Sequence, residues 1–289
     1  SFSICDENGN QVFDSGDMIE QFLAKSYQRS AAELVCSEYD CVEYLPSVEF
    51  ALLSDFQYAL NDPTVDVILC TRGGYGTVQL IDNLDFADFL AHPKMIIGYS
   101  DITVFHEHIP KTYNISTVHA TAPLNFEENS IEALSSLVNV INGKSNQYEI
   151  SGHELNISGE VTAQVTGGNL AIIYSMLGTN SEADYRGKIL FIEEVGEAVY
   201  AVDRMFYALK KSGKLAELSG IIVGGLTNMK DSDVPYGSTV EEVIHSHVTS
   251  LGIPLCFNFP AGHIKDNRAI IIGENARLTV GSDQTIFEQ

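Results

Sequence analysis

Ser100 is the residue of this sequence best placed to act as a nucleophile. It follows the apolar run 95–98, and the residues after it, 101–109, have helical apolar spacing. A serine at such a strand-to-helix turn projects out of the sheet, and the unpaired N–H groups of the first helical turn point toward the group that it attacks. The pattern predicts a nucleophile beside half of an oxyanion hole. Serine is also a favoured N-cap, so Ser100 could instead only cap the helix.

His263 is the candidate general base for this nucleophile. A serine hydroxyl needs a base within hydrogen-bond reach and an acid that orients the base. His263 ends the motif Pro-Ala-Gly-His after the strand-like stretch 253–259, and the small residues around it leave room for a substrate beside the ring. The alternative is a hydrogen-bonded histidine without a catalytic role.

Glu193 is the candidate acid. It ends the apolar run 187–192, and a carboxylate at the end of a buried strand is costly unless it has a partner. Glu194 and Glu197 are alternative acids, and all three could instead belong to a solvated loop.

Five short motifs follow one another along the chain. They are Arg-Gly-Gly-Tyr-Gly after the strand-like run 62–71, Gly-Tyr-Ser-Asp at 98–101, Gly-Gly-Asn-Leu at 167–170 with Leu-Gly-Thr at 177–179, the segment 192–204, and Pro-Ala-Gly-His at 260–263. In this order and spacing they resemble the LD-carboxypeptidases, serine peptidases that cut a bond between an L-centre and a D-amino acid in cell-wall peptides.

The resemblance implies a Ser-His-Glu triad at Ser100, His263 and Glu193. The chain order Ser, Glu, His is that of α/β-hydrolases, although Ile102 stands where their Gly-x-Ser-x-Gly motif has its second glycine. The resemblance also implies a reaction that uses no metal and no organic cofactor.

The glycine-rich segment 72–76 lies at the carboxyl end of a predicted strand, where α/β sheets bind ligands. We expect the N–H groups of Gly74 and Asp101 to form the oxyanion hole. Arg72 could pair with a substrate carboxylate or form a structural salt bridge, and Tyr99 is expected to contact the substrate. A phosphate-binding loop is disfavoured because the spacing matches neither common phosphate motif.

The sequence predicts no metal site. His106 and His108 lie two residues apart on a predicted helix, as do His245 and His247, so the members of each pair face different sides. Cys70 belongs to a predicted buried strand, where a thiol is unreactive.

The first half of the chain alternates predicted strands and helices, which implies a mainly parallel sheet. Asn8-Gly9 predicts a hairpin over residues 1–13, or a displaced first strand. Expected helices span 17–36, 47–60, 79–90 and 101–109, and expected strands span 65–71 and 95–98. The polar residues 142–160 are expected to connect two domains.

The second half is predicted to form a smaller, mixed α/β domain. Expected strands are 160–165, 187–193, 220–226, 269–272 and 276–280, and expected helices are 169–177, 202–212 and 239–250. The predicted architecture is an N-terminal, Rossmann-like α/β domain over 1–145 that carries the nucleophile. The C-terminal domain, over 160–289, carries the glutamate and the histidine, and the active site lies at their interface.

The composition argues against several kinds of partner and favours one cellular compartment. The 289 residues carry a net charge of −23, with 39 acidic and 16 basic side chains, which disfavours nucleic acid and anionic membranes as partners. No apolar run is long enough to span a bilayer, and the first residues do not resemble a signal peptide. Five cysteines without a CxxC motif favour a reducing compartment. We therefore expect a cytoplasmic protein, with a homodimer as the expected assembly.

The function expected from the residues and the resemblance is that of a serine LD-carboxypeptidase. Its substrate would be a peptide with a D-amino-acid C-terminus, a murein tetrapeptide from which it releases D-alanine during wall recycling. One alternative is a microcin-immunity-type hydrolase of a peptidyl nucleotide antibiotic. Another is a ligand-binding protein without catalysis, in which Ser100 only caps its helix.

Overall fold

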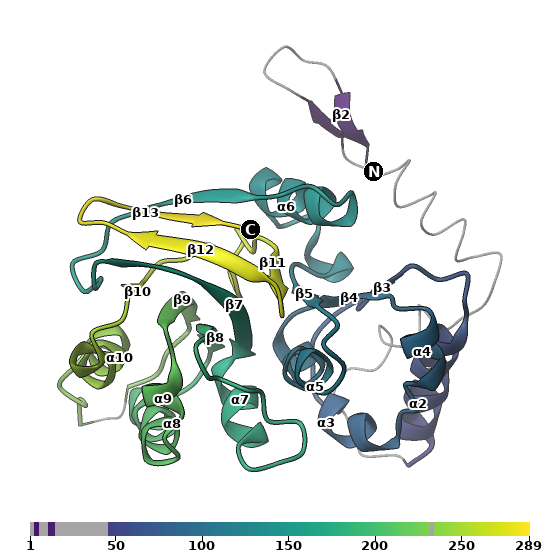
Figure 1. Ribbon diagram of the computed structural model, residues 1–289, viewed down its shortest axis with the longest axis horizontal. Helices are drawn as coiled ribbons and strands as arrows, with labels where there is room; N and C mark the ends of the chain where they lie inside the picture. The colour runs from purple at the N-terminus through teal and green to yellow at the C-terminus, as the bar shows by residue number, and fades with distance from the viewer. Residues whose placement is uncertain (1–2, 6–10, 15–45, 232–233) are drawn as a thin grey trace.

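The computed structural model describes residues 3–5, 11–14, 46–231 and 234–289, and it contains a smaller and a larger sheet (Figure 1). The smaller sheet has the strand order β11-β5-β4-β3. Three of its strands are parallel: β3 (Val67–Leu69), β4 (Met95–Gly98) and β5 (Thr117–His119). The fourth strand, β11 (Ile270–Ile272), joins antiparallel from the end of the chain.

Helices cover the smaller sheet because its strands are apolar on both faces. Ile96 and Ile97 of β4 are both fully buried, and they belong to separate core clusters on the two sides of the sheet. The helical elements here are α2 (Pro46–Asn61), α3 (Thr77–Leu80), η2 (Ile81–Asn83), α4 (Ala87–Ala91), η3 (Ser100–Ile102), α5 (Thr103–Tyr113), η4 (Pro123–Asn125) and α6 (Ile131–Ile141).

The larger sheet is mixed and has the strand order β10-β9-β8-β7-β12-β13-β6. The parallel strands are β7 (Gly159–Asn169), β8 (Ile189–Val195), β9 (Gly220–Thr227) and β10 (Leu255–Cys256); the antiparallel strands are β12 (Asn275–Val280), β13 (Gln284–Glu288) and β6 (Gln147–Ser151). The helical elements are α7 (Leu170–Met176), α8 (Val199–Lys211), α9 (Lys214–Glu217), α10 (Val240–Val248) and η5 (Thr249–Leu251). Figure 1 shows α7, α8, α9 and α10 gathered below the parallel strands.

The predicted fold class is confirmed. The strand expected at 95–98 is β4, and the helix expected at 47–60 is α2. At the start of the chain, β1 (Ser3–Cys5) pairs antiparallel with β2 (Gln11–Asp14), as the predicted hairpin requires. The helix predicted over 17–36 lies outside the described residues.

Two segments differ from the sequence-based expectation because their partners are distant in the chain. Residues 142–160, which the sequence predicts to be a connection, contain β6, and β6 pairs with β13 at the edge of the larger sheet. The strand expected at 269–272 exists as β11, yet it pairs with β5 of the smaller sheet. The chain therefore returns to the first sheet after it has built most of the second.

The helix predicted over 79–90 is wrong as a single element. It is divided into α3, η2 and α4, with Leu84 in an extended conformation. The side-chain amide of Gln57 on α2 donates to the backbone carbonyl of Asp85 and accepts the backbone N–H of Asp85, both at 2.7 Å. Asp85 in turn accepts the N–H of Ala87, 2.9 Å away. These hydrogen bonds satisfy backbone groups that a continuous helix would use itself.

The first turn of α5 fits closely against the end of β7. The hydroxyl of Thr103 accepts the N–H of Asn169 at 2.9 Å. A Cβ at Gly168 would lie 2.4 Å from that hydroxyl oxygen, and the φ of Gly168 is +152°. Only glycine permits this approach. The contact fixes the helix that follows Ser100 against the strand that precedes α7.

Glu107 makes a second contact between α5 and the later part of the chain. Its buried carboxylate accepts the N–H of Ala183 at 3.1 Å and the hydroxyl of Tyr185 at 2.9 Å. Burial raises the pKa of Glu107 to about 7; the two hydrogen bonds and Lys188 lower it, and Glu182 raises it further. A carboxyl whose folded pKa exceeds its ordinary value of 4.5 makes folding less favourable once it ionises.

Glu107→Gln is expected to remove part of the pH dependence of stability. The wild type should lose free energy of unfolding as pH rises from about 4.5 to about 7, since the native state binds a proton that the unfolded state has lost. The loss is on the order of 3 kcal/mol over this range. Urea unfolding at several pH values measures it. Exposed Glu154→Gln is the control, and equal slopes for both variants and the wild type would contradict the assignment.

Candidate active site

Ser100 lies at a strained turn directly after β4. Its φ is +62°, a left-handed value that costs a residue other than glycine or asparagine on the order of 1 kcal/mol. The other non-glycine residues with positive φ in the described part of the chain are all asparagines. Ser100 makes no side-chain capping bond to its helix, so the capping role does not explain the residue. A strained serine between a strand and a helix has the geometry of a nucleophile turn.

Ser100, His263 and Glu193 form one chain of hydrogen bonds. His263 Nε2 lies 3.2 Å from Ser100 Oγ, and His263 Nδ1 lies 2.7 Å from Glu193 Oε2. The backbone N–H of His263 donates to the same carboxylate oxygen at 3.3 Å. The three residues predicted from separate motifs therefore meet, and in the order that a serine nucleophile, a base and an orienting acid require.

Close backbone packing holds the base and the acid together. Glu193 belongs to β8 and is fully buried, whereas His263 lies in the loop after β10 with one-fifth of its side chain exposed. A Cβ at Gly262 would lie 2.6 Å from the Cβ of Glu193, so only glycine fits beside the acid. Asn267 Oδ1 accepts the N–H of Gly262 at 2.7 Å and fixes this loop.

The electrostatics of the site favour a protonated His263. Burial of the ring lowers its pKa, but the hydrogen bond and charge of Glu193, with the charge of Glu194, outweigh burial and raise the pKa above 6.5. Tyr99 packs edge-on against the ring of His263, with centroids 4.9 Å apart, and donates to Asn125 at 2.9 Å. Tyr99 thus supports the base, a contact that the sequence did not predict.

Glu194, the first of the two alternative acids, has other partners. Glu194 Oε2 accepts the N–H of Ala171 at 2.7 Å, in the first turn of α7, and Glu194 Oε1 accepts from Asn169 and from its neighbour Val195. Glu197, the second, lies beyond the end of β8, and its backbone carbonyl accepts the N–H of Lys230. Neighbouring residues of a strand point to opposite sides, which explains why only one of Glu193 and Glu194 faces the histidine.

The glycine-rich segment touches the nucleophile. A Cβ at Gly73 would lie 2.6 Å from the Cβ of Ser100. Arg72 Nε donates to the carbonyl of Gly73 at 3.3 Å, and Gly74 adopts a φ of +148°. The two expected oxyanion donors, at Gly74 and Asp101, thus belong to segments that adjoin Ser100.

The histidines on α5 and α10 have separate partners. His106 binds Thr117 and the carbonyl of Gly98, while His108 binds Ser181. His247 binds Asp203, and His245 binds the carbonyl of Leu155. Within the described ranges, no group of three or more His, Cys, Asp or Glu side chains could hold a metal ion.

The sequence missed the residues that support the triad through their side chains. Asn125, Asn267 and Thr103 each hold one part of the site, and Asn125 and Thr103 lie far in sequence from the groups that they bind. For Asn267 the sequence offers one signal. It is a polar residue four positions after His263 and close to an apolar run, and a polar side chain needs a hydrogen-bond partner once it is buried.

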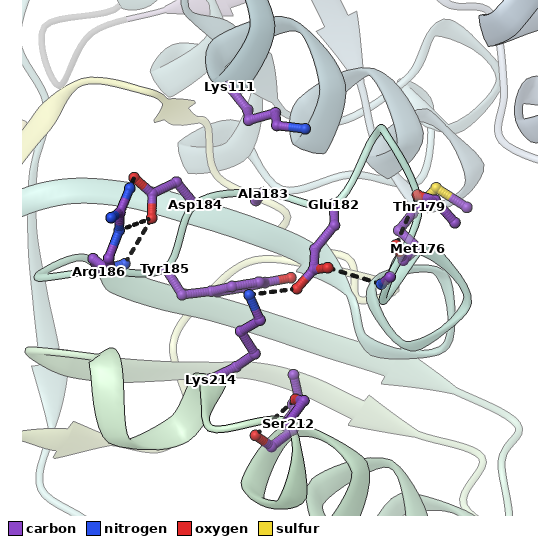
Figure 2. A network of polar contacts seen from close by, with 12 residues as sticks. Lys111, Met176, Thr179, Glu182, Ala183, Asp184, Tyr185, Arg186, Ser212 and Lys214 are labelled. Carbon is purple, nitrogen blue, oxygen red and sulfur yellow. Dashed lines mark hydrogen bonds and ion pairs between the residues drawn. The ribbon is translucent and has the colours of Figure 1, made fainter.

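A hollow of about 380 Å³ lies apart from the triad and is strongly charged. Its charges pair among themselves: Lys214 binds Glu182 at 2.7 Å, and Arg186 binds Asp184 at 2.8 Å (Figure 2). Lys111 donates to the carbonyl of Asn180. The lining residues are Lys111, Thr179, Glu182, Ala183, Asp184, Arg186, Lys214 and Glu217.

Among the described residues, no helix is both long and apolar enough to cross a membrane.

Comparisons with known proteins find one family over both halves of the chain. Residues 19–120 match the family model of the LD-carboxypeptidase N-terminal domain, and residues 162–278 match that of the C-terminal domain. A probable murein peptide carboxypeptidase from Bacillus subtilis is 30% identical over 250 residues, which cover 85% of this chain and 78% of that protein.

Solved structures share most of the fold. The muramoyltetrapeptide carboxypeptidase from Oxalobacter formigenes superposes with a TM-score of 0.78 at 25% identity, over 96% of this chain and 95% of that one. The microcin C7 self-immunity protein superposes with a TM-score of 0.74 at 21% identity, over 83% and 81% of the two chains. The second likeness is one of fold alone.

Proposed function

The chain belongs to the LD-carboxypeptidase family, and we propose that it is a serine-type enzyme that releases the terminal D-alanine of murein tetrapeptides during wall recycling. The observation that carries the proposal is the hydrogen-bonded chain from Ser100 Oγ through His263 to Glu193. The names of the matched relatives, a murein peptide carboxypeptidase and a muramoyltetrapeptide carboxypeptidase, supply the substrate class.

The proposed reaction is acyl transfer to Ser100. His263 Nε2 takes the hydroxyl proton as Ser100 Oγ attacks the carbonyl carbon of the terminal peptide bond. The same proton passes to the departing amine, which leaves as a free D-amino acid, and water then hydrolyses the acyl-enzyme. Glu193 holds the ring in the tautomer whose Nε2 is free to accept, and it stabilises the charged ring that forms.

The oxyanion of the tetrahedral intermediate is assigned to the N–H groups of Gly74 and Asp101. Arg72 is assigned to the terminal carboxylate of the substrate. A positive side chain is needed there because the chain as a whole carries a charge of −23, which repels an anionic peptide.

Incubation with tetrapeptides tests the proposal directly. The protein is mixed with diaminopimelate-containing and lysine-containing murein tetrapeptides, and released D-alanine is measured. Hydrolysis of a peptidyl nucleotide instead would favour a microcin-immunity activity. A fluorophosphonate that labels activated serines separates both from a ligand-binding protein without catalysis, which would not react.

We also propose the cellular compartment and the assembly of the enzyme. We place it in the cytoplasm, in agreement with a recycling role and with the lack of a CxxC motif among its five cysteines. A homodimer is the proposed assembly, which sedimentation equilibrium would measure.

Activity is expected to rise with pH along a single limb set by His263. Neutral imidazole is the base, and the raised pKa of His263 places the midpoint above the ordinary value of ~6.5. EDTA should leave kcat unchanged, since the proposed reaction uses no metal-bound water. Rates of D-alanine release from pH 5 to 9, with and without EDTA, measure both. Activity that chelation abolishes and zinc restores would overturn the mechanism.

A further inference from the structure

The side chain of Asp101 has no part in the triad, yet it is buried directly beside the nucleophile. The residue is 5% exposed. A buried carboxylate is costly unless both oxygens have partners. Oδ2 accepts two hydrogen bonds, whereas Oδ1 has no hydrogen-bond partner within the described part of the chain. Such an under-satisfied charge requires an explanation.

Both hydrogen bonds to Asp101 come from Thr77. The backbone N–H of Thr77 donates to Asp101 Oδ2 at 2.9 Å, and the hydroxyl of Thr77 donates to the same oxygen at 2.7 Å. Thr77 follows Gly76 directly and is itself buried. The carboxylate beside the nucleophile therefore holds the end of the glycine-rich segment 72–76.

The start of that segment is held by packing. The position of a Cβ at Gly73 would be 2.6 Å from the Cβ and 3.0 Å from the Oγ of Ser100, so the two backbones are in close contact. The glycine-rich segment is thus fixed at two points: Gly73 packs against Ser100, and Thr77 binds Asp101. Ser100 and Asp101 are neighbours in the nucleophile turn.

The tip between these two points has little packing of its own. Gly74 and Gly76 have φ values of +148° and +130°, and no described atom outside their immediate neighbours lies within 4 Å of a Cβ built on either. Tyr75 between them is 69% exposed. Two glycines around an exposed residue leave the backbone many alternative conformations.

We infer that Asp101 is a positioning residue, whose carboxylate holds the glycine loop 73–77 in the conformation that presents the Gly74 N–H to the oxyanion. The inference deepens the proposed function and rests on it for the role of Gly74. A charge-assisted hydrogen bond is stronger than a neutral one, and a donor to an oxyanion acts only when it is fixed in place.

The simpler alternative is that Asp101 only anchors the first turn of α3. In that case its removal would lower stability and leave kcat of the folded enzyme unchanged. The two explanations differ in what happens to the loop and to the rate once the protein is folded.

Steady-state kinetics give the first test. Asp101→Ala is expected to lower kcat roughly 10- to 100-fold, with a much smaller change in KM, because one oxyanion donor loses its position. Asp101→Asn should recover most of kcat, since its amide oxygen can accept both bonds. Thr77→Ser keeps both donors and should retain more of kcat than Thr77→Val.

The matched control is Thr239→Val. Thr239 forms a capping box with Glu242 at the start of α10: its N–H donates to the Glu242 carboxylate at 2.8 Å, as the N–H of Thr77 does to Asp101, and its hydroxyl accepts the N–H of Glu242 at 3.2 Å. This variant should lower the Tm without lowering kcat.

A fluorescent reporter tests the loop without any substrate. The sequence contains no tryptophan, so Tyr75→Trp introduces a single indole at the tip of the loop. Adding Asp101→Ala to this background should lower the steady-state anisotropy and increase quenching by acrylamide. Adding Thr239→Val should change neither.

The outcomes decide between the explanations. Unchanged kcat in folded Asp101→Ala, or lowered kcat with unchanged anisotropy, would overturn the inference. If Asp101→Ala does not fold, equal kcat and equal anisotropy for Thr77→Val and Thr77→Ser would overturn it. If the wild type releases no D-alanine while the reporter responds to Asp101→Ala, the proposed function fails and the loop contact stands.

Discussion

Ser100→Ala is expected to abolish D-alanine release while leaving the fold unchanged. Replacing a nucleophile of this type costs on the order of 10⁶-fold in kcat, because the acyl-enzyme cannot form. The hydroxyl makes no capping bond to its helix and binds His263 Nε2 at 3.2 Å, so its loss should change the free energy of unfolding by only about 1 kcal/mol. Turnover measured with thermal unfolding separates the two effects.

Ser246→Ala is a matched control for this variant. Ser246 lies on α10, and its hydroxyl donates to the carbonyl of Val243 at 2.7 Å. Ser246→Ala also removes a serine hydroxyl, but one that does not contact the triad, so turnover should be unchanged. Near-wild-type turnover in Ser100→Ala, or fluorophosphonate labelling of that variant at the wild-type rate, would remove Ser100 from the role of nucleophile.

The nucleophile turn could be predicted because its signals are local. The apolar run of β4, the glycine at its end and the helical spacing after Ser100 all lie within 15 residues. The position of Glu193 near the end of β8 could be predicted for the same reason. A strand that is buried on both faces shows a continuous apolar run, and the carboxylate interrupts that run.

The strands β6 and β11 could not be placed because their pairing depends on distant residues. Tyr148 and Ile150 of β6 alternate with exposed neighbours, a weak pattern that becomes a strand only when β13 offers its edge more than 130 residues later. β11 has a clear apolar pattern, but the sequence does not say which sheet has a free edge for it.

The side-chain contacts of the site were unpredictable for a related reason. Asp101 and Thr77 are 24 residues apart, and only the folded chain shows that the two βα turns adjoin. The choice between Glu193 and Glu194 was limited by strand alternation, which allows one of the two to face His263. Which one does so depends on the pairing of β7 and β8, where Asn169 lies opposite Glu193.

Glu193→Gln is expected to lower kcat by roughly 10⁴-fold, far more than Glu194→Gln or Glu197→Gln. Glu193 Oε2 accepts from His263 Nδ1 at 2.7 Å and so keeps the proton on that nitrogen. A glutamine can turn its NH₂ group toward Nδ1 and shift the proton to Nε2, where it blocks acceptance from Ser100. Glu194 instead binds the first turn of α7, so its variant should lose some stability and little rate.

The pH profile of the residual activity provides a second measurement. The raised pKa of His263 depends on the hydrogen bond and charge of Glu193, and burial alone lowers it. The limb of activity in Glu193→Gln should therefore move to lower pH than in the wild type, while Glu197→Gln should leave it close to its original position. Equal and small losses of kcat in all three variants, with an unmoved limb in Glu193→Gln, would show that another group orients the histidine. A large loss of kcat with the predicted shift, in a variant whose Tm stays close to that of the wild type, would identify Glu193 as the carboxylate that controls the tautomer of His263.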